Sequence, residues 1–223
     1  MGFAVAIDGP AGAGKSTVAK SLAKSLGFVY IDTGAMYRAM ALSCIREGID
    51  LDNEDAVSDF ADKQSIRITY ENGEQVVWLN DENVNGFIRT QAVGDGASKV
   101  SVYGRVRKKL VELQQKLASD GEVVMDGRDI ASCVLPNADV KIYLDANVEV
   151  RAQRRFDELI AKGKEADLET VKAEVIERDY RDMHRDISPL VKVPEAILTD
   201  SSYMTIDETV ATIENIVRKA YKG

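Results

Sequence analysis

Short apolar runs recur along the chain, and longer segments with apolar residues at every third or fourth position separate most of them. The runs predict buried strands at 3–8, 28–31, 122–126, 140–145 and 196–199. The longer segments predict helices at 15–25, 35–47, 102–119, 148–162, 168–181 and 206–221. Strands that alternate with helices of this length form right-handed crossover units. The pattern therefore predicts an α/β fold of three layers, with a five-stranded parallel sheet between two layers of helices.

Residues 65–79 depart from this pattern. Their sequence, SIRITYENGEQVVWL, alternates apolar and polar residues on both sides of Glu71-Asn72-Gly73, which predicts an antiparallel hairpin. A hairpin does not belong in a parallel sheet of this type. We therefore predict that residues 62–97 form an inserted subdomain and that residues 1–61 and 98–223 form the core. Trp78 is expected to pack within the insert rather than to stack on a nucleotide base.

Composition limits the class of partner. With 223 residues, 45% of them hydrophobic, the chain can bury a full core. A net charge of −8 argues against a nucleic-acid-binding or anionic-membrane-binding surface, so any phosphate chemistry must rely on local clusters. Cys44, Cys133 and the single histidine, His184, are far apart in sequence, which predicts neither a disulfide framework nor a zinc site. We expect a cytoplasmic monomer without a membrane span or a signal peptide.

Residues 8–17, DGPAGAGKST, fit the pattern G-x-x-x-x-G-K-[ST] directly after the first predicted strand. In this context, backbone N–H groups and the start of the following helix form a cradle for a polyphosphate, whereas a flexible turn is the alternative. Lys15 would then bridge the terminal phosphates, and the Ser16 hydroxyl would be a ligand of Mg²⁺. The residues expected to bind ATP in this loop are Gly9, Pro10, Ala11, Gly12, Ala13, Gly14, Lys15, Ser16 and Thr17.

Two further motifs carry arginines just after predicted strands. DTGAMYR places Arg38 after the second strand, and DGRD places Arg128 after the third. Because parallel strands end at one edge of a sheet, both arginines should face the phosphate loop and clamp a second phosphate. Asp126 ends an apolar strand and is expected to hold Mg²⁺ through water, with helix capping as the alternative. Phosphoryl transfer to a phosphate oxygen needs no general base, because the acceptor is already anionic.

A third cluster lies near the C-terminus. Arg178, Asp182 and Arg185 are spaced i, i+4 and i+7, which places them on one face of a helix. By charge pattern alone this face is either part of a site or a solvated, salt-bridged surface.

Together these motifs resemble those of nucleoside monophosphate kinases, and most closely those of the bacterial cytidylate kinase family. The stretches that carry the resemblance, in order, are DTGAMYRA, IRTQ, GASKVSVYGRVR, DGRD and ERDYRD. The resemblance implies a P-loop kinase that transfers the γ-phosphoryl group of MgATP to CMP or dCMP. It also implies that the insert binds the monophosphate and that a small lid at about 151–167 covers ATP.

The resemblance further implies roles for single residues. It places Ser98, Arg107 and Asp129 at the edge of cytosine, which offers an N4 donor beside N3 and O2 acceptors. It places Arg178 and Asp182 at the ribose, with Arg185 bracing Asp182 or reaching phosphate.

Thr33 and Tyr37 are expected near the phosphate and sugar, although Thr33 could instead cap a helix. The lid residues expected near ATP are Arg151, Arg154 and Arg155, each of which could equally be a solvated surface residue.

Two other functions remain open on the sequence alone. A P-loop kinase could act on another small acceptor such as UMP, AMP or shikimate, although shikimate kinases lack a sizeable hairpin insert at this place. A nucleotide-binding scaffold protein without turnover would not need the arginines. An assay of ADP release with a panel of acceptors distinguishes the three.

Overall fold

The computed structural model describes residues 2–119 and 121–221; residues 1, 120, 222 and 223, which fall in the predicted core, lie outside the described residues. A parallel five-stranded sheet forms its centre, in the order β2-β6-β1-β7-β8. The strands are β1 (Ala4–Asp8), β2 (Val29–Asp32), β6 (Val123–Gly127), β7 (Val140–Asp145) and β8 (Ile197–Asp200). The predicted parallel sheet and all five of its strands are confirmed.

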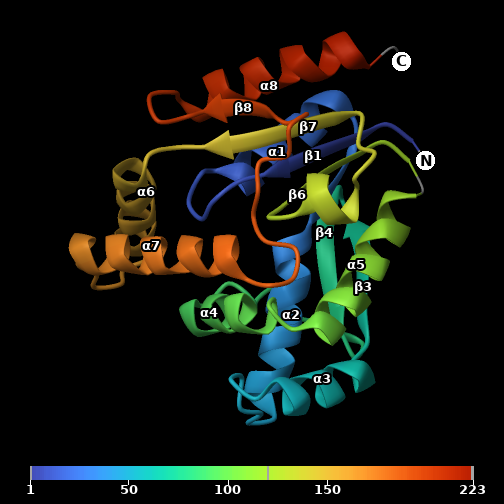
Figure 1. Cartoon of the computed structure of the whole chain (residues 1–223), viewed down its shortest axis with the longest axis vertical. Coiled ribbons are helices and arrows are strands. Elements are labelled where there is room, and N and C mark those ends of the chain that lie inside the picture. Colours follow the sequence, from blue (N-terminus) through green and yellow to red (C-terminus); the bar gives the residue numbers. More distant parts are fainter. Residues whose placement is uncertain (1, 120, 222–223) are drawn as a thin grey trace.

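Helices cover both faces of this sheet (Figure 1). Every residue of β1 is buried, because its side chains alternate between the two covered faces. Val5 and Ile7 pack against α1 (Lys15–Leu26) and α8 (Ile206–Ala220), whereas Ala4 and Ala6 belong to the core under α2 (Thr33–Arg46) and α5 (Gly104–Ala118). The three-layer arrangement predicted from the sequence is therefore confirmed.

The hairpin is present and extends to a small second sheet, in the order β3 (Ile66–Glu71), β4 (Glu74–Leu79) and β5 (Glu82–Asn83). Asn72 and Gly73, with φ of 52° and 78°, form its two-residue turn. The Trp78 indole donates to the Thr69 hydroxyl at 2.8 Å and lies 4.8 Å beneath the Arg67 guanidinium. Trp78 thus contacts its own hairpin, as expected; the limits 62–97 of the insert stay a prediction.

Two helices beside the small sheet, α3 (Glu54–Lys63) and α4 (Gln91–Val100), were not predicted. The sequence of α4, QAVGDGASKV, contains two glycines, which disfavour a helix. Close packing on α2 explains them. A Cβ at Gly96 would lie 3.2 Å from the Ala41 side chain, and a Cβ at Gly94 would lie 3.0 Å from the Arg38 guanidinium. Tertiary packing, rather than propensity, therefore stabilises α4, and Gly94 makes room for Arg38.

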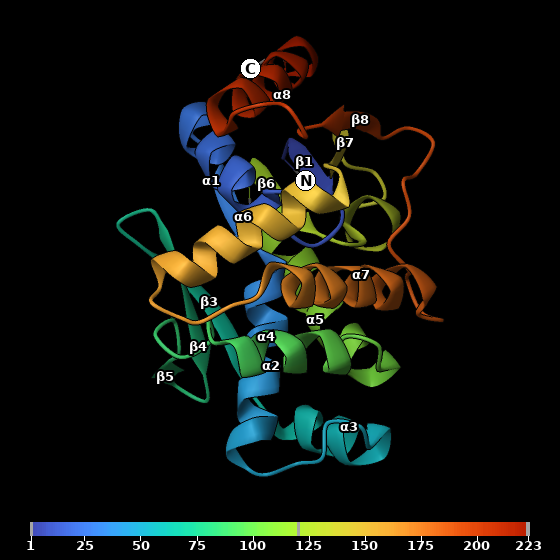
Figure 2. The same ribbon diagram turned by 90° about the vertical axis from the view of Figure 1, so that its left-hand side faces the viewer.

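The last pair of helices, α6 (Val148–Ala161) and α7 (Leu168–His184), is joined by the loop that begins at Lys162. Figure 2 shows α7 lying between α6 and α4, across the end of the sheet. The helix α7 runs three residues beyond its predicted end at Arg181 and ends at His184. Arg185 follows the helix with an extended backbone, so the prediction that Arg178, Asp182 and Arg185 lie on one helix face is wrong for Arg185.

Cys44 is buried and Cys133 half-buried, both as free thiols, and His184 is exposed, with its ring stacked on Tyr180 at 4.0 Å. Within the described residues, no helix has the length and apolar character needed to span a membrane.

Candidate active site

The glycine-rich loop lies between β1 and α1, at the carboxyl edge of the sheet (Figure 1). A Cβ at Gly9 would collide with the carbonyl oxygen of Leu144, and Gly14 precedes α1 with a φ of 89°. Lys15 is buried and its Nζ donates to the Pro10 carbonyl at 2.6 Å. Burial and then the nearby Arg128 lower the pKa of Lys15 well below its usual value. Lys15 is therefore held next to a loop whose conformation is suited to binding phosphates.

Asp126, at the end of β6, lies directly beside the loop. Its carboxylate accepts hydrogen bonds from the Ser16 hydroxyl at 2.9 Å and the Tyr30 hydroxyl at 2.8 Å. Burial, followed by the neighbouring Asp32, raises the pKa of Asp126 to about 6. Because its two oxygens bind side-chain hydroxyls, Asp126 does not act as a helix cap.

The oxygen donors of Ser16 and Asp126 suit a Mg²⁺ ion that takes its other ligands from a bound substrate. Mg²⁺ prefers oxygen ligands and commonly uses one or two carboxylates together with phosphates and water. Across residues 2–119 and 121–221, no three histidine, cysteine or acidic side chains gather as a metal cage. Ser16 and Asp126 provide oxygen ligands that suit a Mg²⁺ ion bound together with a nucleotide.

Thr33, which follows the end of β2, contacts the end of β6. Its hydroxyl donates to the Asp126 carbonyl oxygen at 2.8 Å, whereas the residue that caps α2 is Asp32, whose carboxylate accepts from the Ala35 N–H at 3.0 Å. The capping alternative for Thr33 is therefore wrong. Asp32 and Asp126 are register partners in neighbouring strands, which places both carboxylates at the sheet edge below the loop.

A cavity of about 140 Å³, here named the acceptor cavity, reaches from Ser16 into the space between α2, α5 and α7. Four of the expected arginines line it, together with five other expected residues and Ser16 of the phosphate loop. The lining residues predicted from the sequence are Thr33, Tyr37, Arg38, Arg107, Asp126, Arg128, Asp129, Asp182 and Arg185, with Ser16 at the loop. The sequence prediction that Arg38 and Arg128 lie at one crevice with the phosphate loop agrees with this geometry.

Three arginines of this cavity, Arg107, Arg128 and Arg185, are held by carboxylates. Arg128 Nε donates to Asp182 Oδ2 at 2.7 Å. Asp129 lies between two guanidinium groups: Arg107 Nη2 donates to Oδ2, and Arg185 Nη2 donates to Oδ1 at 3.2 Å. The two Asp129 pairs are buried and the Arg128–Asp182 pair is partly buried, which fixes these arginines in place before any ligand binds.

The position of Asp129 depends on an unpredicted π-helical turn, η1 (Ile130–Val134). The Asp8 carboxylate, at the end of β1, accepts from the N–H groups of Ile130 and Ala131 at 2.8 Å each. Burial raises the pKa of Asp8 to about 6. Asp8 thus attaches the start of η1, and with it the preceding Asp129, to the central strand.

Two polar atoms near the cavity lack partners within the described part of the chain. The Tyr37 hydroxyl and the Arg178 Nε are buried without a hydrogen bond. Burial raises the pKa of Tyr37 to about 12, and burial followed by Arg128 lowers the pKa of Arg178 to about 10. Buried polar atoms are normally satisfied, so these two are suited to a ligand with hydrogen-bonding groups.

Some predicted residues lie elsewhere. Ser98 does not line the cavity; its hydroxyl accepts from Arg181 at 2.9 Å, and Ala97 and Ser101 lie at the wall instead. Among the lid residues, Arg154 donates to the Ser201 carbonyl at 2.8 Å, and Arg155 binds Glu158 and Gln91.

Arg151 is buried against the phosphate loop, where its Nη1 donates to the Ala11 carbonyl at 2.9 Å. A contact of Ser98 with the base, and contacts of the lid arginines with ATP, stay predictions.

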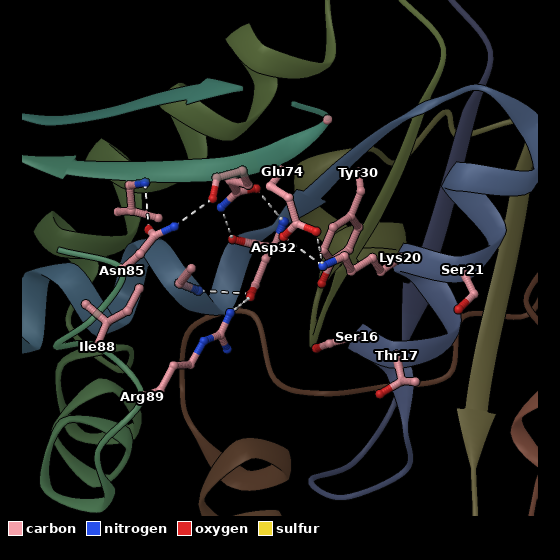
Figure 3. Close-up of a pocket in the computed structure, with 14 residues that line it drawn as sticks. Ser16, Thr17, Lys20, Ser21, Tyr30, Asp32, Glu74, Asn85, Ile88 and Arg89 are labelled. Carbon is pink, nitrogen blue, oxygen red and sulfur yellow. Dashed lines mark hydrogen bonds and ion pairs between the residues drawn. The ribbon is translucent and has the colours of Figure 1, made fainter. Parts of the chain in front are cut away.

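Arg89, which was not predicted from the sequence, lines both the acceptor cavity and a larger groove of about 500 Å³ between α1 and the hairpin (Figure 3). Arg89 Nη2 lies 2.5 Å from Asp32 Oδ2, and across the groove Lys20 pairs with Glu74 at 2.7 Å. Arg89 belongs to the IRTQ stretch, so an arginine just after the hairpin was the available signal.

Residues 5–219 match the profile of a protein family described as cytidylate kinase. The chain belongs to the cytidylate kinase family. It is 49% identical over 219 residues to the cytidylate kinase of Lactobacillus gasseri, covering 98% of this chain and 95% of that protein. It is also 49% identical over 222 residues to the cytidylate kinase of Pediococcus pentosaceus, covering 99% and 97%.

A solved structure of an uncharacterized protein from Eubacterium ventriosum shares the fold, with a TM-score of 0.54, 13% identity and coverage of 97% and 98%. Membership of the cytidylate kinase family makes this chain a phosphotransferase that uses ATP.

Proposed function

We propose that this member of the cytidylate kinase family transfers the γ-phosphoryl group of MgATP to CMP or dCMP, giving ADP and CDP or dCDP. The observation that carries the proposal is the acceptor cavity, which begins at the phosphate-loop residue Ser16 and ends at Asp129 between two arginines. A donor phosphate in the loop and an acceptor phosphate at Arg38 and Arg128 would then be neighbours.

In this proposal the phosphate loop holds the donor with its backbone N–H groups, and Lys15 leaves the Pro10 carbonyl to bridge the terminal phosphates. Arg38 and Arg128 hold the acceptor phosphate and neutralise charge that develops during transfer. Ser16 would bind Mg²⁺ directly and Asp126 through water. When bound, Mg²⁺ supplies further neutralisation of the phosphate oxygens.

The remaining residues orient the nucleoside. Arg178 and Asp182 would contact the ribose, where the unpaired Nε of Arg178 finds an acceptor. Arg107 and Asp129 would read the cytosine edge, because a guanidinium beside a carboxylate matches the N3 and O2 acceptors and the N4 donor. We further propose that residues 62–97 act as the monophosphate-binding insert, that about 151–167 acts as the lid, and that the chain is a monomer.

A coupled assay of ADP release tests the reaction. Purified protein with Mg²⁺ and ATP should release ADP rapidly with CMP or dCMP and far more slowly with UMP, AMP or shikimate. A Lys15→Ala protein, checked by circular dichroism, serves as the control for contaminating kinases. Faster release with UMP or AMP than with CMP would replace the proposed acceptor, and no release with any acceptor would favour a binding protein without turnover.

A further inference from the structure

A buried ion pair between Asp179 and Arg151 holds the phosphate loop from outside. Asp179, in α7, accepts a hydrogen bond from the Ala11 N–H at 2.9 Å through Oδ1. Its other oxygen accepts from Arg151 Nη1, in α6. The same Nη1 donates to the Ala11 carbonyl at 2.9 Å. Asp179 and Arg151 therefore bind both backbone polar groups of one loop residue.

This arrangement is rigid. Both residues are only 7% exposed, and Arg151 Nε also donates to the Ala146 carbonyl at 2.8 Å. A Cβ at Gly12 would lie 3.2 Å from the Arg151 Cβ, so the loop packs directly on the first turn of α6. Charge-assisted hydrogen bonds between buried groups are strong and directional, so the first half of the loop is held in one position.

The helix that carries Asp179 also forms the acceptor cavity. Asp182, one turn further along α7, lines that cavity and binds Arg128 at 2.7 Å. A single helix thus contacts the phosphate loop through Asp179 and the acceptor cavity through Asp182. We infer that Asp179 is a positioning residue, whose carboxylate sets the phosphate loop in register with the acceptor cavity. The kinetic effects expected from this role rest on the proposed function, whereas the expected change in nucleotide binding rests only on the use of ATP.

The substitution that tests this is Asp179→Asn. The asparagine can still accept from the Ala11 N–H with one oxygen, but its NH₂ group faces the N–H groups of Arg151 and the ion pair is lost. Because a misplacement of about 1 Å at a reacting centre can cost about a hundredfold, we expect kcat/KM for ATP to fall about 10- to 100-fold. The KM for CMP should change less than about threefold, since the Asp182–Arg128 and Asp129–Arg107 pairs remain.

A matched control exists on the same two helices. Lys172 of α7 and Glu149 of α6 form an exposed ion pair at 3.1 Å that does not contact the phosphate loop. Lys172→Met removes a salt bridge between α6 and α7 without touching the loop. It should leave kcat, both KM values and MgADP affinity unchanged, and a loss equal to that of Asp179→Asn would assign the effect to the helix pair in general.

Binding of MgADP, measured by calorimetry without any acceptor, separates this inference from the proposed function. The Asp179→Asn protein should bind MgADP at least about tenfold more weakly than wild type, whichever acceptor the enzyme uses. Unchanged MgADP affinity in folded Asp179→Asn protein would overturn the inference. Absence of CMP phosphorylation by the wild type would overturn only the proposed function.

If the Asp179→Asn protein does not fold, the Asp179→Glu protein provides the test of the positioning role. The glutamate keeps the charge beside Arg151 but moves the carboxylate by one methylene relative to the Ala11 N–H. Weaker MgADP binding with a normal KM for CMP supports the positioning role, and wild-type MgADP binding refutes it.

Discussion

The carboxylate of Asp129 offers the sharpest test of how the proposed acceptor is recognised. In the structure its two oxygens accept from Arg107 and Arg185, and the residue is only 6% exposed. A carboxylate has about four lone-pair sites, so two remain for a ligand at the cavity wall. Asp129 can therefore orient the two arginines and also accept a hydrogen bond from the cytosine N4 amino group.

Substitution Asp129→Ala separates these roles by their effect on selectivity. A hydrogen bond to a charged group contributes roughly 1.5 to 3 kcal/mol, and each 1.4 kcal/mol corresponds to about a factor of ten. If Asp129 reads the N4 amino group, kcat/KM for CMP should fall about 10- to 100-fold more than kcat/KM for UMP, which has a carbonyl at that position. Loss of the carboxylate should also lower stability by about 3 to 5 kcal/mol, because two buried arginines lose their partner.

The assay is kcat/KM for both nucleotides in wild type and variant, at a temperature well below the melting midpoint of the variant. Asp139→Ala is the control for stability. The Asp139 carboxylate accepts from the Ala4 N–H at 2.8 Å, away from the cavity, so its loss should leave the CMP to UMP ratio unchanged. An equal loss for both substrates in Asp129→Ala would refute base reading by Asp129 and leave it the arginine-orienting role alone.

Lys15→Ala should lower kcat at least about a hundredfold while circular dichroism stays unchanged, and normal turnover would contradict the phosphate-loop assignment. Arg38→Ala and Arg128→Ala should each lower kcat/KM for CMP with MgADP affinity little changed; loss of MgADP binding instead would show that the two sites were divided wrongly. The Asp8 pKa is higher in the folded state, about 6 against 3.8, so its carboxyl stabilises the fold fully below pH 4 and less as the pH rises through 6. Urea unfolding should therefore show the stability advantage of wild type over Asp8→Asn shrinking by about 2 kcal/mol between pH 4 and 6.5, and a constant difference would contradict the raised pKa.

The sequence predicted those parts of the fold that follow from local pattern. The central strands are apolar because both faces are covered, and the Asn72-Gly73 pair marks the hairpin through its positive φ angles. The helix α4 was missed because its glycines disfavour a helix, and only contact with α2 explains them. The turn η1 was missed because the Asp8 carboxylate that holds it comes from 122 residues earlier in the chain.

The same distinction applies to the candidate site. Residues after strand ends, such as Arg38 and Arg128, could be placed because parallel strands end at one edge. The role of Asp179 could not be predicted in this way. The spacing of Arg178, Asp182 and Arg185 drew attention to one side of the predicted helix, and Asp179 lies on another. Its partner Ala11 lies 168 residues away, so no periodicity within α7 indicates the contact.

The distribution of paired and unpaired arginines explains how a chain with a net charge of −8 can bind two anionic substrates. Arg107, Arg128 and Arg185 are each held by a carboxylate, which lowers the cost of burying them and fixes their direction. Among the described residues, Arg38 forms no ion pair; its Nη1 donates only to the Ile88 carbonyl, at 3.2 Å. Burial, and then the nearby Arg89, lowers the pKa of Arg38, as expected for a cation without a counter-charge. A phosphate in the acceptor cavity would supply that counter-charge, so the driving force for binding is concentrated at Arg38 while the paired arginines set the geometry.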